Sequence, residues 1–266
     1  MSDKNIRPNT CLLGAISGDM IGSCFERNRC TDPQFELFSK SSRFTDDTVL
    51  TIAVADAISN RRGYGEAIVE YAKRYPKAGY GSYFRRWLAE GGVEPYNSFG
   101  NGSAMRISAV GWAFNTAEDV LREAERSAAV THDHPEGIKG AQAVALAIYL
   151  ARTGIGKAEI RQEIETHFEY DLRRALDDIR PNYEWDSTSP GSVPESIIAF
   201  LESTDFESAV RNAILLGGDA DTMAAIAGSI AEAYYGGMPE EITAEVRERL
   251  PTDLLDVVEK FQIYAR

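Results

Sequence analysis

Helical patterning runs through almost the whole sequence and limits the fold more than any other feature. Apolar and small residues recur at the spacing of a helix face in stretches such as residues 48–63, 137–154 and 222–237. No stretch shows the alternation of apolar and polar residues, bounded by turns, that is typical of a half-buried strand. The sequence therefore predicts an all-α protein of about ten to fourteen helices.

The length and continuity of the chain predict one domain. It has 266 residues and no low-complexity linker, and a chain of this size can bury a sizeable core. We expect a compact, single-domain helical bundle over residues 1–266. Residues 90–105 and 183–194 interrupt the helical pattern, and long loops in compact domains often carry function.

Several of the predicted helices are rich in small residues. Gly14, Ala15, Ser17 and Gly18 lie in the first one, expected over residues 11–26. A glycine inside a helix costs up to ~1 kcal/mol relative to alanine. Because small side chains let two helices approach closely, we interpret this pattern as tight helix packing in the core.

The charge balance and the cysteines exclude several classes of protein. The net charge is −13, and no run of Lys or Arg supplies the basic face that strong nucleic-acid binding needs. The negative charge also disfavours anionic membranes, and no apolar stretch approaches the ~20 residues of a membrane span. The polar N-terminus has no signal-peptide core, and the three cysteines crowd residues 11–30 without a CxxC motif. We expect a cytoplasmic protein.

Two short acidic clusters stand where helices are expected to begin. The stretch "GGDADT" contains Asp219 and Asp221, and "TDDT" contains Asp46 and Asp47. Residues one or two positions apart do not share a helix face, so we expect each pair to converge on the turn before its helix. Carboxylates and threonine hydroxyls are hard oxygen ligands that suit Mg²⁺, Mn²⁺ or Ca²⁺ rather than zinc.

The residues alone leave two interpretations of these clusters open. Each cluster could be a solvated helix cap, for which one side-chain oxygen suffices. Alternatively the two clusters meet, and four crowded carboxylates would then repel one another unless a cation compensates them.

Five motifs in a fixed order give a resemblance to a known family. They are "GDMIGSCFE", "FTDDT", "SFGNGSAMR", "THDHPEGIKGA" and "GGDADTMAAIAG". In this order they resemble the ADP-ribosylglycohydrolases, which include the dinitrogenase-reductase-activating glycohydrolase and the ADP-ribosyl-acceptor hydrolases. The match covers about residues 9–237. Any single motif would be weak evidence, whereas the ordered set is specific.

The resemblance implies a binuclear metal cleft in the centre of an all-helical domain. Two Mg²⁺ or Mn²⁺ ions would be held there by Thr45, Asp46, Asp47, Asp219, Asp221 and Thr222. Glu26 matches the family glutamate beside the metals and is expected to orient or deprotonate a water, and Asp47 is expected to be catalytic as well as a ligand. Asp19 is either a hydrogen-bonded core residue or a support for this site.

The resemblance also implies where the substrate binds. Ser98, Phe99, Gly100, Asn101, Gly102 and Ser103 match the family loop around the diphosphate and the distal ribose. The two glycines would let backbone N–H groups approach phosphate oxygens, and Phe99 is expected beside the adenine or ribose. His132 is expected near the ribose and phosphate. For Arg106 we expect a structural ion pair rather than a phosphate clamp.

The implied activity is hydrolysis of the bond between ADP-ribose and an acceptor, which releases ADP-ribose. The partners would be an ADP-ribosylated protein or a small-molecule substrate, with ADP-ribosyl-arginine as the first expectation. The "GYGSYFRRW" stretch, residues 79–87, resembles bacterial members and favours arginine. Serine, O-acetyl-ADP-ribose and a nucleic-acid end stay open as acceptors. A non-catalytic ADP-ribose-binding protein and a structural relative are the alternatives to an enzyme.

Overall fold

The computed structural model describes residues 10–265, and this part of the chain contains fifteen α-helices and one short 3-10 helix, η1 (Arg180–Asn182). The α-helices are α1 (Leu13–Gly22), α2 (Asp46–Ser59), α3 (Tyr64–Arg74), α4 (Ser82–Ala89), α5 (Gly102–Met105), α6 (Ser108–Ala113), α7 (Ala117–Ala128), α8 (Pro135–Arg152), α9 (Lys157–Phe168), α10 (Leu176–Ile179), α11 (Ser189–Leu201), α12 (Phe206–Leu216), α13 (Ala220–Tyr235), α14 (Glu240–Arg249) and α15 (Thr252–Tyr264).

The predicted all-α class is confirmed. Within residues 10–265 the only β-type pairing is an isolated bridge between Gly100 and Thr188. The helix number slightly exceeds the expected ten to fourteen, because short helices such as α5 and α10 add to the long ones. Helix α9 ends at Phe168, and its C-cap Glu169 has a left-handed φ of 55°. Residues 1–9, which carry the expected absence of a signal peptide, and residue 266 lie outside the described part.

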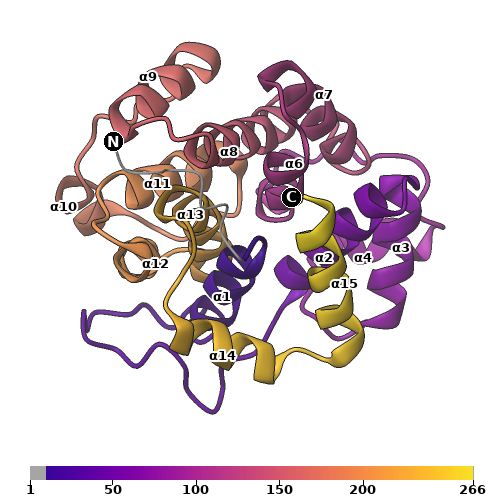
Figure 1. Ribbon diagram of the computed structural model, residues 1–266, viewed down its shortest axis with the longest axis horizontal. Coiled ribbons are helices and arrows are strands. Elements are labelled where there is room, and N and C mark those ends of the chain that lie inside the picture. Colours follow the sequence, from indigo (N-terminus) through magenta and orange to yellow (C-terminus); the bar gives the residue numbers. More distant parts are fainter. Residues whose placement is uncertain (1–9, 266) are drawn as a thin grey trace.

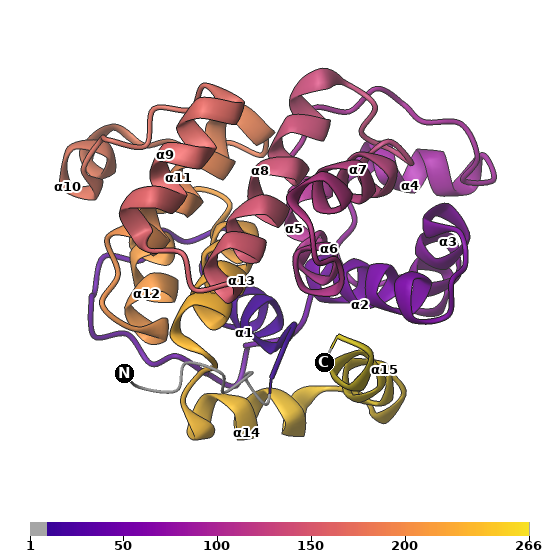
Figure 2. The same cartoon turned by 45° about the horizontal axis from the view of Figure 1, so that its top comes forward.

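Helices α1 and α13 form the centre of a single compact domain. Figures 1 and 2 both show α1 lying against α13 inside a ring of the other helices. Every residue of α1 is buried. Gly14, Gly18 and Gly22 face α13, and a Cβ on Gly18 would lie only 2.1 Å from the carbonyl oxygen of Ala224. The expected tight packing of small residues is therefore confirmed, and it brings two helix backbones into direct contact.

The remaining helices pack around this pair in two groups. Helices α11 and α12 cover α13 on one side, together with α8. On the other side α2 packs on α3, α6 and α15 (Figure 1). Helix α7 packs on α8. No helix of the described residues has the length and apolar character to cross a membrane.

Two irregular segments meet beside the central helices. The backbone N–H of Asn101 donates to Ser187 (2.8 Å), and that of Ser189 donates to Phe99 (2.9 Å). These bonds join the loop before α5 to the loop before α11. A third irregular segment was not expected: α1 ends at Gly22 rather than at residue 26, and residues 23–45 contain no helix.

Candidate functional site

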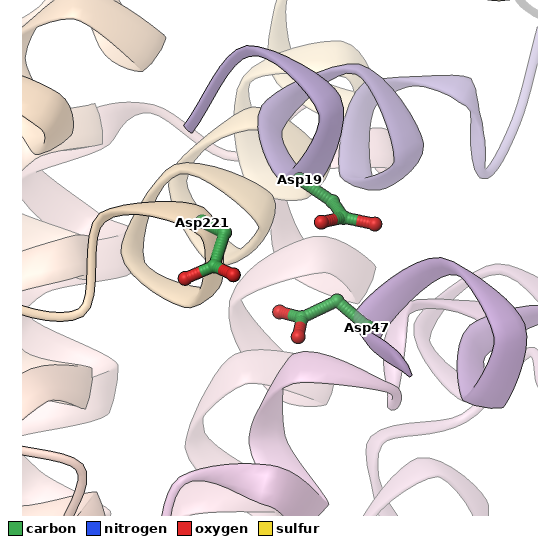
Figure 3. Close-up of side chains that lie close together, drawn as sticks. All are labelled: Asp19, Asp47 and Asp221. Carbon is green, nitrogen blue, oxygen red and sulfur yellow. The ribbon is translucent and has the colours of Figure 1, made fainter. Parts of the chain in front are cut away.

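Three buried aspartates from three different helices converge next to the α1–α13 contact. Asp19 comes from α1, Asp47 from α2 and Asp221 from α13, and one carboxylate oxygen of each lies within 4.8 Å of the others. Figure 3 shows the three carboxylates turned toward one another. The two acidic clusters of the sequence therefore meet, and a pair of separate solvated caps is excluded.

The clusters occupy helix starts, although not as expected. Thr45 is the N-cap of α2, and its hydroxyl accepts from the backbone N–H of Asp47 (3.2 Å). Asp46, Asp47 and Asp221 lie in first helical turns rather than on the preceding turns, so that expectation was wrong for them. Asp219 is the N-cap of α13 and makes no side-chain capping bond, which leaves its carboxylate for other contacts.

Asp19 anchors the start of α2 to α1. Its carboxylate accepts hydrogen bonds from the backbone N–H of Thr45 (2.8 Å) and Thr48 (3.1 Å) and from both threonine hydroxyls. Burial raises the pKa of Asp19, against the effect of these four bonds. Asp19 is therefore a hydrogen-bonded core residue that also fixes the position of the neighbouring carboxylates.

The carboxylates are crowded, and no basic side chain of the described residues pairs with them. Burial, followed by the charge of Asp19, raises the pKa of Asp46 to about 7 and raises the pKa of Asp47 well above its usual range. Burial and the charge of Asp47 raise the pKa of Asp221 in the same way. Within residues 10–265 none of these groups forms an ion pair with Lys or Arg.

The donor set fits a hard divalent cation. The Oδ1 atom of Asp47 is buried and has no hydrogen-bond partner among the described residues. Burial is the main cause that raises the pKa of Asp47, and the neighbouring Thr222 side chain acts against it, so a hydroxyl adds to the oxygen-rich surroundings. Carboxylate and hydroxyl oxygens are the ligands that Mg²⁺ and Mn²⁺ prefer.

Glu26 and Asp219 lie at the edge of this cluster. Glu26 is partly exposed, in the turn after α1. Burial is the main cause that raises the pKa of Asp46, Asp219 and Asp221, and the charge of Glu26 adds to it. Asp219 accepts a hydrogen bond from the Asn101 amide (2.8 Å). All the residues predicted as metal ligands thus gather in one place with Glu26, and their roles stay predictions.

The loop of residues 98–103 lies directly against this edge. A Cβ on Gly102 would lie 3.1 Å from His132 Nε2, and one on Gly100 would lie 3.6 Å from it, so the loop passes close over the histidine. Phe99 is 49% exposed and its ring lies 5.4 Å from that of His134. His134 itself caps α8 through the N–H of Glu136.

Two side chains of this loop are occupied inside the protein. Asn101 is buried and donates to Asp219 and to the hydroxyl of Ser192 (3.2 Å). Ser103 is buried and donates to the carbonyl of Gly137 (2.7 Å), while the hydroxyl of Ser98 accepts from the N–H of Gly100 (3.1 Å). What this loop offers a ligand is therefore mainly its backbone. The link from Asn101 to Asp219 has no signal in the sequence.

A sequence model of the ADP-ribosylglycohydrolase family matches residues 5–266. The chain belongs to the ADP-ribosylglycohydrolase family. Its members are glycohydrolases, so the chain is placed among enzymes that cleave glycosidic bonds.

Relatives and a solved structure agree with this placement. The ADP-ribosylhydrolase ARH3 of Homo sapiens is 27% identical over 92% of this chain and 90% of its own length. The ADP-ribosylarginine hydrolase Tri1 of Pseudomonas putida is 27% identical over 94% of this chain and 78% of its own length. A solved structure described as an ADP-ribosylglycohydrolase-related protein complex shares the fold with a TM-score of 0.73, at 24% identity, over 98% of both chains.

Arg106 of this ADP-ribosylglycohydrolase does not form the ion pair expected from its sequence. Its side chain is fully buried, and no carboxylate of residues 10–265 lies within ion-pairing distance of it. Its NH2 group instead donates to the carbonyl of Ser127 (3.2 Å) and the hydroxyl of Thr131 (2.9 Å). The guanidinium is thus held by neutral groups behind the loop of residues 98–103.

Proposed function

We propose that this chain removes ADP-ribose from a modified acceptor by metal-assisted hydrolysis of the glycosidic bond. The convergence of Asp19, Asp47 and Asp221 carries the proposal, because packing alone gives no reason to crowd buried acids without cations. Membership of a glycohydrolase family supports the same reaction class. A non-catalytic ADP-ribose-binding protein or a structural relative would have no need of this carboxylate set.

We assign the metal ligands from the residues that meet in the cluster. Two Mg²⁺ or Mn²⁺ ions would be held by Thr45, Asp46, Asp47, Asp219, Asp221 and Thr222. When bound, such ions would neutralise the carboxylates and act as a Lewis acid toward ribose oxygens and water. Asp19 would serve them indirectly, by holding Thr45 at the start of α2.

Glu26 is the proposed acid–base residue. Cleavage of a glycosidic bond builds positive charge on the sugar ring. Glu26 would take a proton from the attacking water and return one to the leaving group. Its partly exposed position at the edge of the cluster suits contact with both water and acceptor. Asp47, deeper in the cluster, would orient the water.

The loop of residues 98–103 would bind the remote part of the substrate. Backbone N–H groups near Gly100 and Gly102 would face the diphosphate, where binding energy positions the reacting bond. Phe99 is exposed enough to contact the adenine or distal ribose. His132 would reach the same region through Nε2.

ADP-ribosyl-arginine is the proposed acceptor linkage. Tri1 is named an ADP-ribosylarginine hydrolase and aligns over 94% of this chain. Glu26 forms no ion pair within the described residues and could lie against a guanidinium. An O-linked substrate, such as ADP-ribosyl-serine or O-acetyl-ADP-ribose, is the second candidate, because relatives named ADP-ribosylhydrolase without an acceptor also match most of the chain.

We also propose a cytoplasmic location, because the chain has few cysteines and no CxxC motif.

The test is release of ADP-ribose from two matched peptides that carry the modification on arginine or on serine. The protein should release ADP-ribose in the presence of Mg²⁺ or Mn²⁺, faster from the arginine peptide, and chelation should stop the reaction. Release only from the serine peptide would select the second candidate. ADP-ribose binding without release from either peptide or from O-acetyl-ADP-ribose would refute an enzyme and leave a binding protein.

A further inference from the structure

A buried positive charge stands behind the loop of residues 98–103 without an acid to balance it. Arg106 is fully shielded from solvent, and its Nε and Nη1 atoms find no hydrogen-bond partner among residues 10–265. Burial lowers the pKa of Arg106 to about 10, so it remains charged at neutral pH. Removing one partner of a buried charge is strongly destabilising in proteins, so an arginine kept here without a carboxylate calls for an explanation.

Among the described residues one side chain, that of Thr131, accepts a hydrogen bond from Arg106, and it leads to His132. Arg106 Nη2 donates to Thr131 Oγ1 (2.9 Å), which lies 2.7 Å from His132 Nδ1. A guanidinium can only donate hydrogen bonds, so the Thr131 oxygen accepts from it. Within the described part of the chain the only acceptor in reach of the Thr131 proton is His132 Nδ1. Nδ1 therefore accepts, and the proton of the neutral ring resides on Nε2.

The protonated nitrogen faces the glycines of the loop. Nε2 lies 3.1 Å from the Cβ position of Gly102 and 3.6 Å from that of Gly100. No residue of the described chain accepts a hydrogen bond from Nε2, although the rest of the ring is buried. Burial and the charge of Arg106 lower the pKa of His132 well below its usual range, which keeps the ring neutral.

We propose that Arg106 is a positioning residue that acts through Thr131 to commit His132 to the Nε2–H tautomer, as a fixed neutral donor toward a phosphate oxygen of bound ADP-ribose. The assignment of the phosphate rests on the proposed function, whereas the tautomer rests on the contacts alone. Since His132 enters the site with its proton already placed, no rearrangement is needed when the ligand arrives.

The experiment reads the tautomer and the affinity separately. The chain has three histidines, so long-range ¹H–¹⁵N NMR spectra of protein labelled at histidine are simple, and His132→Gln assigns the signal. Wild type should show His132 as the Nε2–H form alone. Thr131→Val keeps the branched shape but removes the hydroxyl, and it should give a mixture of tautomers. Thr131→Ser keeps the hydroxyl and should retain the wild-type form.

Calorimetric titration with ADP-ribose gives the second readout. Thr131→Val should bind ADP-ribose about fivefold more weakly, as for one lost hydrogen bond, while Thr131→Ser should stay within about twofold. Arg106→Met should shift the tautomer as Thr131→Val does; if it fails to fold, the threonine pair still decides. The proposal is overturned if wild-type His132 carries its proton on Nδ1, or if Thr131→Val leaves both tautomer and affinity unchanged. Absence of ADP-ribose binding by wild type would refute the proposed function but not the tautomer, which is measured without ligand.

Discussion

Gly18→Ala should destabilise the protein by forcing α1 away from α13. A Cβ on Gly18 would lie 2.1 Å from the carbonyl oxygen of Ala224, 2.3 Å from its carbonyl carbon and 2.6 Å from the backbone nitrogen of Ala225. Non-bonded carbon atoms normally stay about 3.5–4 Å apart. All three atoms belong to the backbone of α13, so no side-chain rotation can relieve the clash and one helix has to shift.

The expected size of the effect follows from two opposing terms. Overpacking a dense core costs about 1–3 kcal/mol, and contact with backbone on three sides places this case at the upper end. Alanine recovers about 1 kcal/mol relative to glycine inside a helix. The net loss in the free energy of unfolding is therefore about 2 kcal/mol, which corresponds to a fall in Tm of about 4–8 °C for a chain of this size.

Thermal unfolding of Gly18→Ala and of a matched control measures this directly. The control is Gly65→Ala in α3, where the new Cβ would meet only Val130 Cγ1 at 3.4 Å. With no clash, and with Gly65 in the first turn of α3, the control should lose no stability and should gain at most about 1 kcal/mol from helix propensity. Because Asp19 follows Gly18, the variant should also gain less stability from added Mg²⁺. A Gly18→Ala protein that melts at or above the wild-type temperature would refute the argument that the backbones are in contact.

Three further predictions concern acidic side chains. Asp221→Asn should leave the metal-free Tm unchanged or higher, since one repelling charge is lost, but it should lose most of the Tm gain that wild type shows in a Mg²⁺ or Mn²⁺ titration. The exposed control Asp178→Asn should keep that gain. An equal gain in Tm for both variants would count against the metal site. Glu26→Gln should slow ADP-ribose release far more than it weakens ADP-ribose binding, and wild-type turnover would remove Glu26 as the acid–base residue. Burial raises the pKa of Glu232 from 4.5 to about 7, so its contribution to stability is present below pH 4.5 and is lost as pH rises through 7. Urea unfolding at pH 5 and pH 8 should therefore show a loss of about 3 kcal/mol at most in wild type, and Glu232→Gln should remove this loss. The same fall in the free energy of unfolding between the two pH values in variant and wild type would contradict the prediction.

The sequence predicted the helices and the small-residue core well because both are local patterns. It misplaced the end of α1, since that end depends on a distant segment. The hydroxyl of Ser23 donates to the carbonyl of Met20 (2.8 Å) and accepts from the backbone N–H of Arg43 (3.2 Å). Ser23, the C-cap of α1, is thus tied to a residue twenty positions further along, where helical periodicity carries no information.

The candidate site was predictable in its members but not in its arrangement. The motif order selected Asp47, Asp219 and Asp221, and the structure brings them together. The support of the site was harder to read, because Asn101 reaches Asp219 across 118 positions and Arg106 takes neutral partners where an acid is the usual one. Such contacts follow from tertiary packing, and a single sequence holds no local signal for them.

The contact between α1 and α13 also sets the order in which the protein can be completed during synthesis. The N–H of Gly14 pairs with the Glu232 carboxylate, 218 residues later in the chain, and at about 5–20 residues per second the ribosome needs roughly 10–45 s to make that length. Throughout this interval α1, whose every residue is buried in the finished protein, has not yet met the helix that covers it. Helix α1 therefore leaves the ribosome well before its partner, and the nascent chain carries this apolar helix without the cover of α13 until α13 has been made.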